Sequence, residues 1–106
     1  MPKYLFQVSF TAEGTRGVLA EGGTKRKQAV AQLMKSLGGK LETMYFAFGS
    51  SDSFCIAELP DHASAAAGTM LVGASGAGRV TTTVLMTPAE IDEACARQGK
   101  YRPPGS

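Results

Sequence analysis

The sequence is poor in the residues that most often reveal a chemistry. Its 106 residues include no tryptophan, one histidine and two cysteines, and charged residues make up 19%. Cys55 and Cys95 lie too far apart for the close spacing of a metal site, and two isolated thiols are typical of the reducing cytoplasm. No motif dictates a reaction, so neither a metal site nor a cofactor is predicted.

Long hydrophobic runs and a strong net charge are also absent. No apolar stretch approaches the length of a membrane-spanning helix, and the chain begins with a lysine-containing strand pattern rather than a signal peptide. The net charge is only +2, and the basic residues do not alternate with stacking aromatic residues. We therefore expect a cytoplasmic protein that binds neither a membrane nor nucleic acid.

What remains is ordinary globular composition, with 43% hydrophobic residues. A chain of this length suits one domain with a two-layer core. We expect a single domain over residues 1–98. Residues 99–106, which read Gly-Lys-Tyr-Arg-Pro-Pro-Gly-Ser, are expected to form a flexible C-terminal tail.

Hydrophobic periodicity predicts both strands and helices. Alternating or β-branched segments predict strands over residues 3–10, 40–48, 53–59 and 79–86. Apolar residues at helical spacing predict one helix that begins at a Thr24 cap and ends at Gly38-Gly39, and a second that begins at Pro60-Asp61. Glycines between residues 11 and 23 leave only a short helical turn near residues 16–20. A capping box, Thr87-Pro88-Ala89-Glu90, predicts a short C-terminal helix.

This order of elements is that of the ferredoxin-like α+β fold, βαββαβ. Right-handed crossovers place the four strands in the sheet order 4-1-3-2, with antiparallel neighbours and both helices on one face. Both faces nevertheless carry apolar side chains: Leu5, Met44, Phe46, Phe48, Cys55 and Ala57 on one, and Tyr4, Phe6, Tyr45, Phe54 and Ile56 on the other. An uncovered apolar face marks an interface, so a homodimer through the helix-free sheet face is predicted.

The topology also sorts the polar residues. Strands one and two end where strands three and four begin, so the segments 11–17, 49–53 and 73–79 should share one end of the domain. That end would collect Arg16, Asp52 and Arg79, and His62 would lie at the opposite end. Ser–His–Asp and Cys–His chemistry is accordingly disfavoured.

Three further residues have two interpretations each. Asp52 either bonds the backbone of its own hairpin or has a ligand-facing or acid/base role. Arg26 lies at the edge of the apolar stripe of its helix, where it either pairs with a carboxylate such as Glu58 or Glu42 or binds an anion. Tyr45 belongs either to the dimer face or to the wall of a pocket between sheet and helices. The candidate ligand-binding residues are thus Asp52, Arg16, Arg79, Arg26 and Tyr45.

Several segments resemble the GYD-domain family: Met1-Pro2-Lys3-Tyr4-Leu5, Glu21-Gly22-Gly23-Thr24, Gly38-Gly39-Lys40-Leu41-Glu42, Tyr45-Phe46-Ala47-Phe48-Gly49, Asp52, Leu59-Pro60-Asp61, Ser64-Ala65-Ala66, Thr81-Thr82-Thr83 and Leu85-Met86-Thr87-Pro88. The likeness is spread over residues 1–95. It implies a dimeric α+β barrel and no particular activity. Where the family motif reads Gly-x-Tyr-Asp, this chain has Gly49-Ser50-Ser51-Asp52, so Ser51 replaces the tyrosine.

Two classes of function fit these features. The first is a homo-oligomeric small-molecule-binding or accessory protein. The second is a cofactor-independent enzyme, similar to the monooxygenases and isomerases built on dimeric α+β barrels, an analogy that rests on fold alone. The first is favoured because the enzyme needs an acid or base inside a pocket, and only Asp52, Glu58 and Tyr45 offer one.

Overall fold

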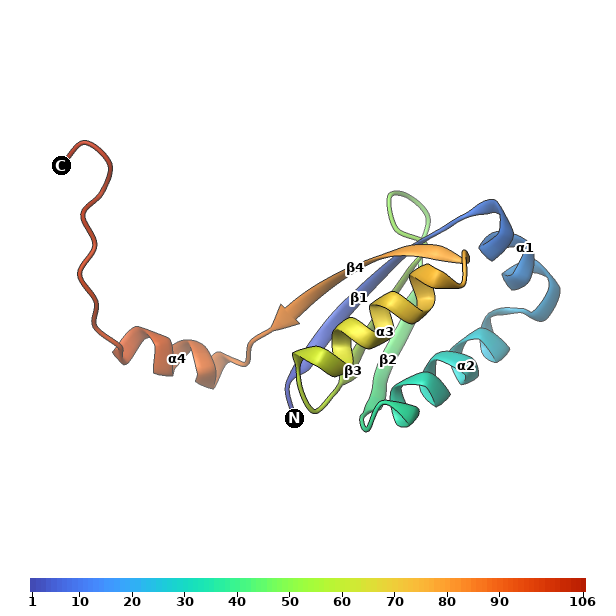
Figure 1. Ribbon diagram of the computed structural model, residues 1–106, viewed down its shortest axis with the longest axis horizontal. Helices are drawn as coiled ribbons and strands as arrows, with labels where there is room; N and C mark the ends of the chain where they lie inside the picture. Colours follow the sequence, from blue (N-terminus) through green and yellow to red (C-terminus); the bar gives the residue numbers. More distant parts are fainter.

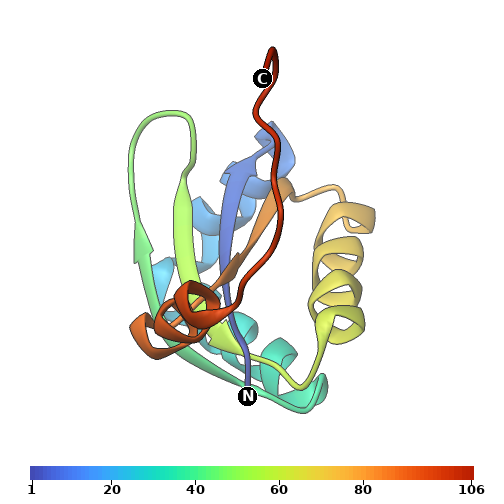
Figure 2. The same ribbon diagram turned by 90° about the vertical axis from the view of Figure 1, so that its left-hand side faces the viewer.

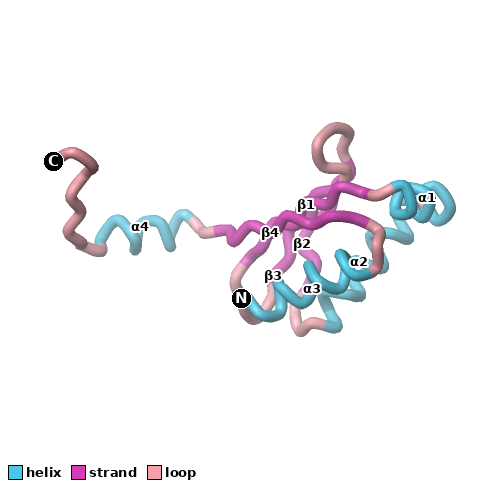
Figure 3. Tube along the Cα trace, turned by 45° about the horizontal axis from the view of Figure 1, so that its top comes forward, coloured by secondary structure: helices cyan, strands magenta, loops and turns pink.

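The computed structural model describes all 106 residues, which form a four-stranded antiparallel sheet with helices on one side (Figures 1 and 3). The strands are β1 (Lys3–Phe10), β2 (Lys40–Phe46), β3 (Ser53–Glu58) and β4 (Gly78–Leu85). Their order in the sheet is β2-β3-β1-β4. This is the predicted order 4-1-3-2 read from the other edge, so the predicted strand order is confirmed.

Four helices connect or follow the strands: α1 (Ala12–Glu21), α2 (Gly23–Ser36), α3 (His62–Ala74) and α4 (Pro88–Ala96). The capping box that predicted α4 is present, with the Thr87 side chain bonded to the Glu90 N–H and the Glu90 side chain bonded to the Thr87 N–H. Asp61 caps α3 by accepting from the Ser64 N–H at 2.8 Å.

The segment before α2 differs from the sequence-based prediction. Residues 12–21 form a complete helix rather than a short turn, because Thr11 caps its start by accepting from the Gly14 N–H. Gly22, with a φ of +84°, then separates α1 from α2. The expected Thr24 cap is wrong: Gly22 is the cap, two residues earlier, and it has no side-chain bond to the helix.

The register shows which residues share a face. Tyr4 lies opposite Ala57 and Phe6 opposite Cys55, whereas Leu5 lies opposite Ile56. The predicted division of β1 between the two faces is therefore wrong: Tyr4 and Phe6 join Met44, Cys55 and Ala57 on the helix-covered face. The cause is physical, because pairing two strands one residue out of step moves every side chain to the other face.

The core lies between this covered face and helices α2 and α3. Its buried apolar members are Tyr4, Phe6, Met34, Cys55, Ala57, Leu59 and Ala65. Small residues at positions 65 and 68 of α3 are buried, which lets that helix approach the sheet closely. The opposite face, which we call the open face, carries Leu5, Tyr45, Phe54 and Ile56 and has no helix over it.

The C-terminal part of the chain stands apart from this core. No residue of α4 is buried, and residues 97–106 contain neither helix nor strand. Figure 1 shows α4 and the C-terminus beyond the end of β4. None of the helices is both long enough and apolar enough to span a bilayer.

Two glycines of α1 provide a test of this packing. A Cβ on Gly14 would lie 1.8 Å from the Ala77 carbonyl oxygen, whereas one on Gly17 meets nothing within 4 Å. We expect Gly14→Ala to lower the free energy of unfolding by about 1–3 kcal/mol or more, because backbone must move. Gly17→Ala should raise it by up to about 1 kcal/mol through helix propensity. Urea denaturation measures both, and equal effects would contradict the described position of α1.

Candidate functional site

A cavity of about 110 Å³ lies between the covered face of the sheet and helices α1, α2 and α3. We call it the helix-side cavity. Most of its lining is hydrophobic, with Phe6, Val8 and Phe10 contributed by β1 and Val30 and Leu33 by α2. Small residues also line it, namely Gly14, Gly68 and Ala77. A side chain at Gly14 would meet the Ala77 carbonyl, so this glycine allows α1 to lie close to the wall of the cavity.

Arg26 is the only charged residue that lines this cavity. Its Nη1 lies 3.7 Å from the Glu21 Oε1, and its side chain is 35% exposed. A half-exposed ion pair at this distance contributes little stability. The guanidinium has five N–H donors, so this single long contact leaves it free to bind an anion.

The carboxylates expected to pair with Arg26 have other partners. Glu58 pairs with Lys40 at 3.3 Å and Glu42 pairs with Lys3. The reason lies in the register, which places both Lys3 and Lys40 opposite Glu58 at one end of the sheet. The predicted partners of Arg26 are therefore wrong, and its partner comes from the end of the preceding helix.

Two small polar side chains complete the wall of the cavity near β3. Ser53 is the only buried polar residue of the protein, and Cys55 lies two residues further along the same strand. Burial raises the pKa of the Cys55 thiol to about 11. At neutral pH it is a protonated, weakly polar group rather than a nucleophile. No carboxylate and no imidazole lines the cavity.

Asp52 makes structural contacts beside the cavity. Its Oδ2 accepts from the Phe10 N–H at 2.8 Å, and its own N–H donates to the Val8 carbonyl at 2.8 Å. It forms no ion pair with Arg16 or Arg79. Because Phe10 lines the cavity, Asp52 holds part of the wall in place.

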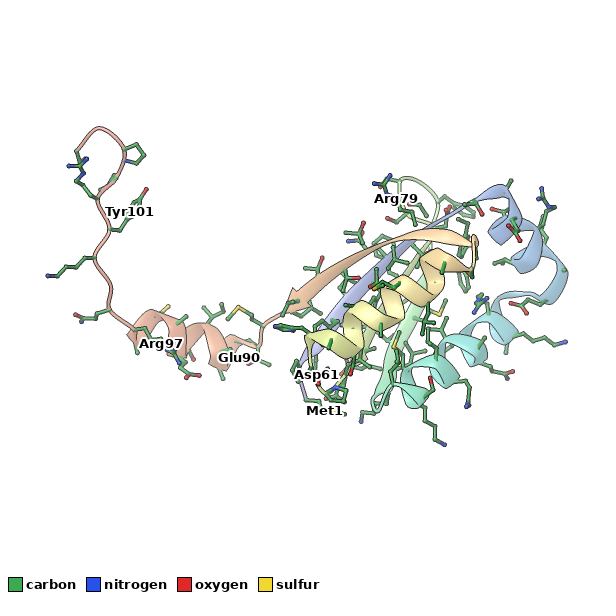
Figure 4. The ribbon with its side chains drawn as sticks, in the orientation of Figure 1. Met1, Asp61, Arg79, Glu90, Arg97 and Tyr101 are labelled. Atoms are coloured by element: carbon green, nitrogen blue, oxygen red, sulfur yellow. The ribbon has the colours of Figure 1, made fainter.

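Arg16 and Arg79 lie at the same end of the domain as Asp52, as the topology predicted. Arg79 lies opposite Ser9, whose hydroxyl donates to the Ser50 carbonyl in the hairpin. Arg16 belongs to α1, whose cap Thr11 bonds to the Gly76 and Ala77 carbonyls. Both arginines are exposed. Figure 4 shows Arg79 at this end and Asp61, the neighbour of His62, at the other.

Tyr45 does not line the helix-side cavity. It lies opposite Phe54 on the open face and is 71% exposed. Its predicted place in the wall of a pocket between sheet and helices is therefore wrong. The five candidate residues are thus divided: Arg26 lines the cavity, Asp52, Arg16 and Arg79 lie at the hairpin end, and Tyr45 lies on the open face.

Sequence reasoning missed a contact between Tyr4 and His62. The Tyr4 hydroxyl lies 2.7 Å from the His62 Nδ1, and the two rings meet edge to face. Both border a shallow groove of about 370 Å³ between α3 and β4, which also contains the bonded hydroxyls of Thr69 and Thr82. A signal was available, because a tyrosine in a buried strand needs a partner for its hydroxyl.

The fold and the cavity define a small α+β domain that encloses an apolar space with one cationic group at its wall. The family model of the GYD domain matches residues 4–95. The chain therefore belongs to the GYD domain family, as the resemblance indicated. Comparisons with curated proteins and with solved structures find no match.

The burial of Cys55 leads to a prediction about thiol reactivity. With a pKa of about 11, only about one molecule in a thousand carries the Cys55 thiolate at pH 8. In a Cys95→Ala variant, we expect no reaction with a thiol reagent at pH 8 in the folded state and one reactive thiol after denaturation. Reaction should increase as the pH rises toward 11. Fast labelling of the folded variant at pH 8 would contradict the described burial.

Proposed function

We propose that the protein is a homodimeric module that binds a small apolar carboxylic acid in the helix-side cavity. The observation that carries the proposal is the single guanidinium, Arg26, at the wall of an otherwise apolar space. Such a site suits a ligand with a hydrocarbon body and one anionic end, because pockets of this kind use few polar groups to fix orientation. Charge-assisted bonds from arginine to carboxylate are strong and often bidentate.

The size of the cavity limits the ligand. Its volume of about 110 Å³ is somewhat below the about 150 Å³ of an engineered cavity that accepts benzene. A chain of a few carbons therefore suits the space better than a ring, with the carboxylate at Arg26. Arg16 and Arg79, exposed at the hairpin end, would add positive potential that favours the approach of an acid. Asp52 would act by positioning Phe10.

Binding is favoured over catalysis by the same lining. A cofactor-independent monooxygenase or isomerase needs an acid or base at the reacting atoms. The cavity offers only Arg26 and the protonated Cys55 thiol as titratable groups. Glu58 and Tyr45, the other acid or base candidates from the sequence, do not line it. No observation therefore supports the enzyme.

The open face supports the homodimer. Leu5, Phe54 and Ile56 form a half-buried apolar patch there, and Tyr45 beside them is 71% exposed. Phe48 in the adjoining hairpin is fully exposed. Contiguous apolar surface of this kind marks interaction sites, and two copies of one face satisfy a two-fold dimer. The two unpaired cysteines fit a reducing compartment such as the cytoplasm.

The dimer is tested by placing a charge on the open face. We expect the wild-type protein to sediment as a dimer at micromolar concentration and Phe54→Asp to sediment as a monomer, because a buried unpaired charge is costly. Leu19→Asp is the matched control, since Leu19 is 80% exposed on α1, away from this face. A monomeric wild type, or the same behaviour in both variants, would refute the dimer.

Ligand binding is tested at Arg26, with hexanoate as the probe and hexanol as its uncharged counterpart. Losing bonds to a charged group costs about 1.5–3 kcal/mol, so Arg26→Met should weaken hexanoate binding by about 10- to 100-fold. Binding of hexanol and the melting temperature should change little, because the Glu21 contact is weak. Lys27→Met is the control on the exposed side of α2.

Titration calorimetry or chemical shifts of the cavity residues give the affinities. A purely structural Arg26 would give the opposite result, a lower melting temperature with unchanged hexanoate affinity. No measurable hexanoate binding by the wild type would also refute the proposed site.

A further inference from the structure

The part of the chain that follows β4, which we call the C-terminal arm (residues 86–106), has no partner within its own chain. Ile91, Ala94 and Cys95 fall at helical spacing and form an apolar stripe along α4. All of α4 is exposed, with Ile91 at 47% and the preceding Met86 at 54%. Figure 2 views the molecule from the side of the arm and shows α4 apart from α3.

An isolated helix of this length is unstable in water. Helices shorter than about 12–15 residues are marginal without packing, and α4 has nine. Its start is nevertheless well defined, with a capping box and Pro88 at the first helical turn. The capping box, Pro88 and the apolar stripe together indicate that α4 is a helix that is stabilised by packing against another surface.

The connection between β4 and α4 is short and extended. Only Met86 and Thr87 separate β4 from α4. Thr87 is extended, with φ −75° and ψ 157°, and the proline that follows it disfavours helical backbone there. No residue of α4 is buried, and Figure 1 shows the helix beyond the end of β4 rather than over the sheet.

A second copy of this chain supplies what is missing. Four strands about 4.8 Å apart and six to eight residues long give a flat face of about 450 Å², or about 900 Å² for two copies. Stable interfaces bury about 1,200–2,000 Å² in total. The flat area is smaller than the accessible surface of the side chains that the face carries, and two packed arms would add further buried area to the interface.

The distribution of charge agrees with packing between copies. α4 contains three acidic residues, Glu90, Asp92 and Glu93, and no basic residue. Residues 1–87 carry eight lysines and arginines against six aspartates and glutamates. Three basic residues follow in the arm, Arg97, Lys100 and Arg102, so the complementarity is confined to α4, whose acidic side chains favour approach to the positively charged body of the other copy.

We propose that the C-terminal arm of each subunit crosses to the other, so that the Ile91–Ala94–Cys95 stripe of α4 packs against the body of the partner beside the paired open faces. The proposal rests on the homodimer proposed above. It adds that the arm is part of the dimer interface rather than a free appendage.

Cys95 reports directly on this contact. Cys95 is exposed in the single chain and Cys55 is buried, so a thiol reagent at pH 8 labels Cys95 alone. The Cys95→Ala variant gives the background labelling rate. The labelling rate of the wild type should fall at least tenfold as the protein concentration rises through the dimer dissociation constant. A rate independent of concentration in a protein that sediments as a dimer overturns the arm exchange and leaves the dimer standing.

A pair of charge substitutions on α4 tests the stripe itself. Ile91→Asp should raise the dimer dissociation constant at least tenfold and restore fast labelling of Cys95. Ala89→Asp, two residues away on the opposite side of α4, should change neither, since an acidic residue in the first turn is favourable. Both are compared by sedimentation and by circular dichroism, which checks that the domain remains folded.

The remaining outcomes separate this proposal from the one on which it rests. A wild type that is monomeric at every concentration overturns both the dimer and the arm exchange. A monomer with slow Cys95 labelling places the arm on its own domain and overturns the exchange. If the protein is a dimer and Ile91→Asp and Ala89→Asp change its dissociation constant and its Cys95 labelling rate equally, the arm exchange is overturned and the dimer is not.

Discussion

The structure depends on a cluster of backbone contacts where β1 ends. Asp52 from the hairpin accepts from the Phe10 N–H, and Thr11 bonds to two carbonyls of the connection between α3 and β4. Gly14 then lets α1 approach the Ala77 carbonyl at a distance that no side chain allows. These contacts tie three connections that are distant in sequence, and they place α1 over the helix-side cavity.

The cavity is a consequence of this arrangement. α1 is held against the Gly76–Ala77 connection. The space between β1 and the helices is bounded by Phe6, Phe10 and aliphatic residues, with small residues at Gly14, Gly68 and Ala77. Arg26 enters at the start of α2, directly after the Gly22 break, and its only ion pair is with Glu21 on the other side of that break. A cation with one long, half-exposed contact is suited to exchange that contact for a ligand.

The two faces of the sheet have different roles. The covered face holds the buried core and the cavity, and the open face presents apolar side chains that no helix of the chain covers. The arm after β4 has the same character, an apolar stripe that no segment of the chain covers. The proposals connect these features, with ligand binding on one side of the sheet and assembly on the other.

Sequence by itself determined the strands, α2, α3, α4 and the strand order, because periodicity, caps and handed crossovers are local or combinatorial rules. The length of the Gly-rich helix α1 was underestimated, because its stability comes from the Thr11 cap and from contacts of Thr11 with Gly76 and Ala77. Only the tertiary structure decided the face of Tyr4 and Phe6, the partner of Arg26 and the Tyr4–His62 contact. Each of these depends on the register with which distant strands pair, and a shift of one residue reverses a face without changing any local pattern.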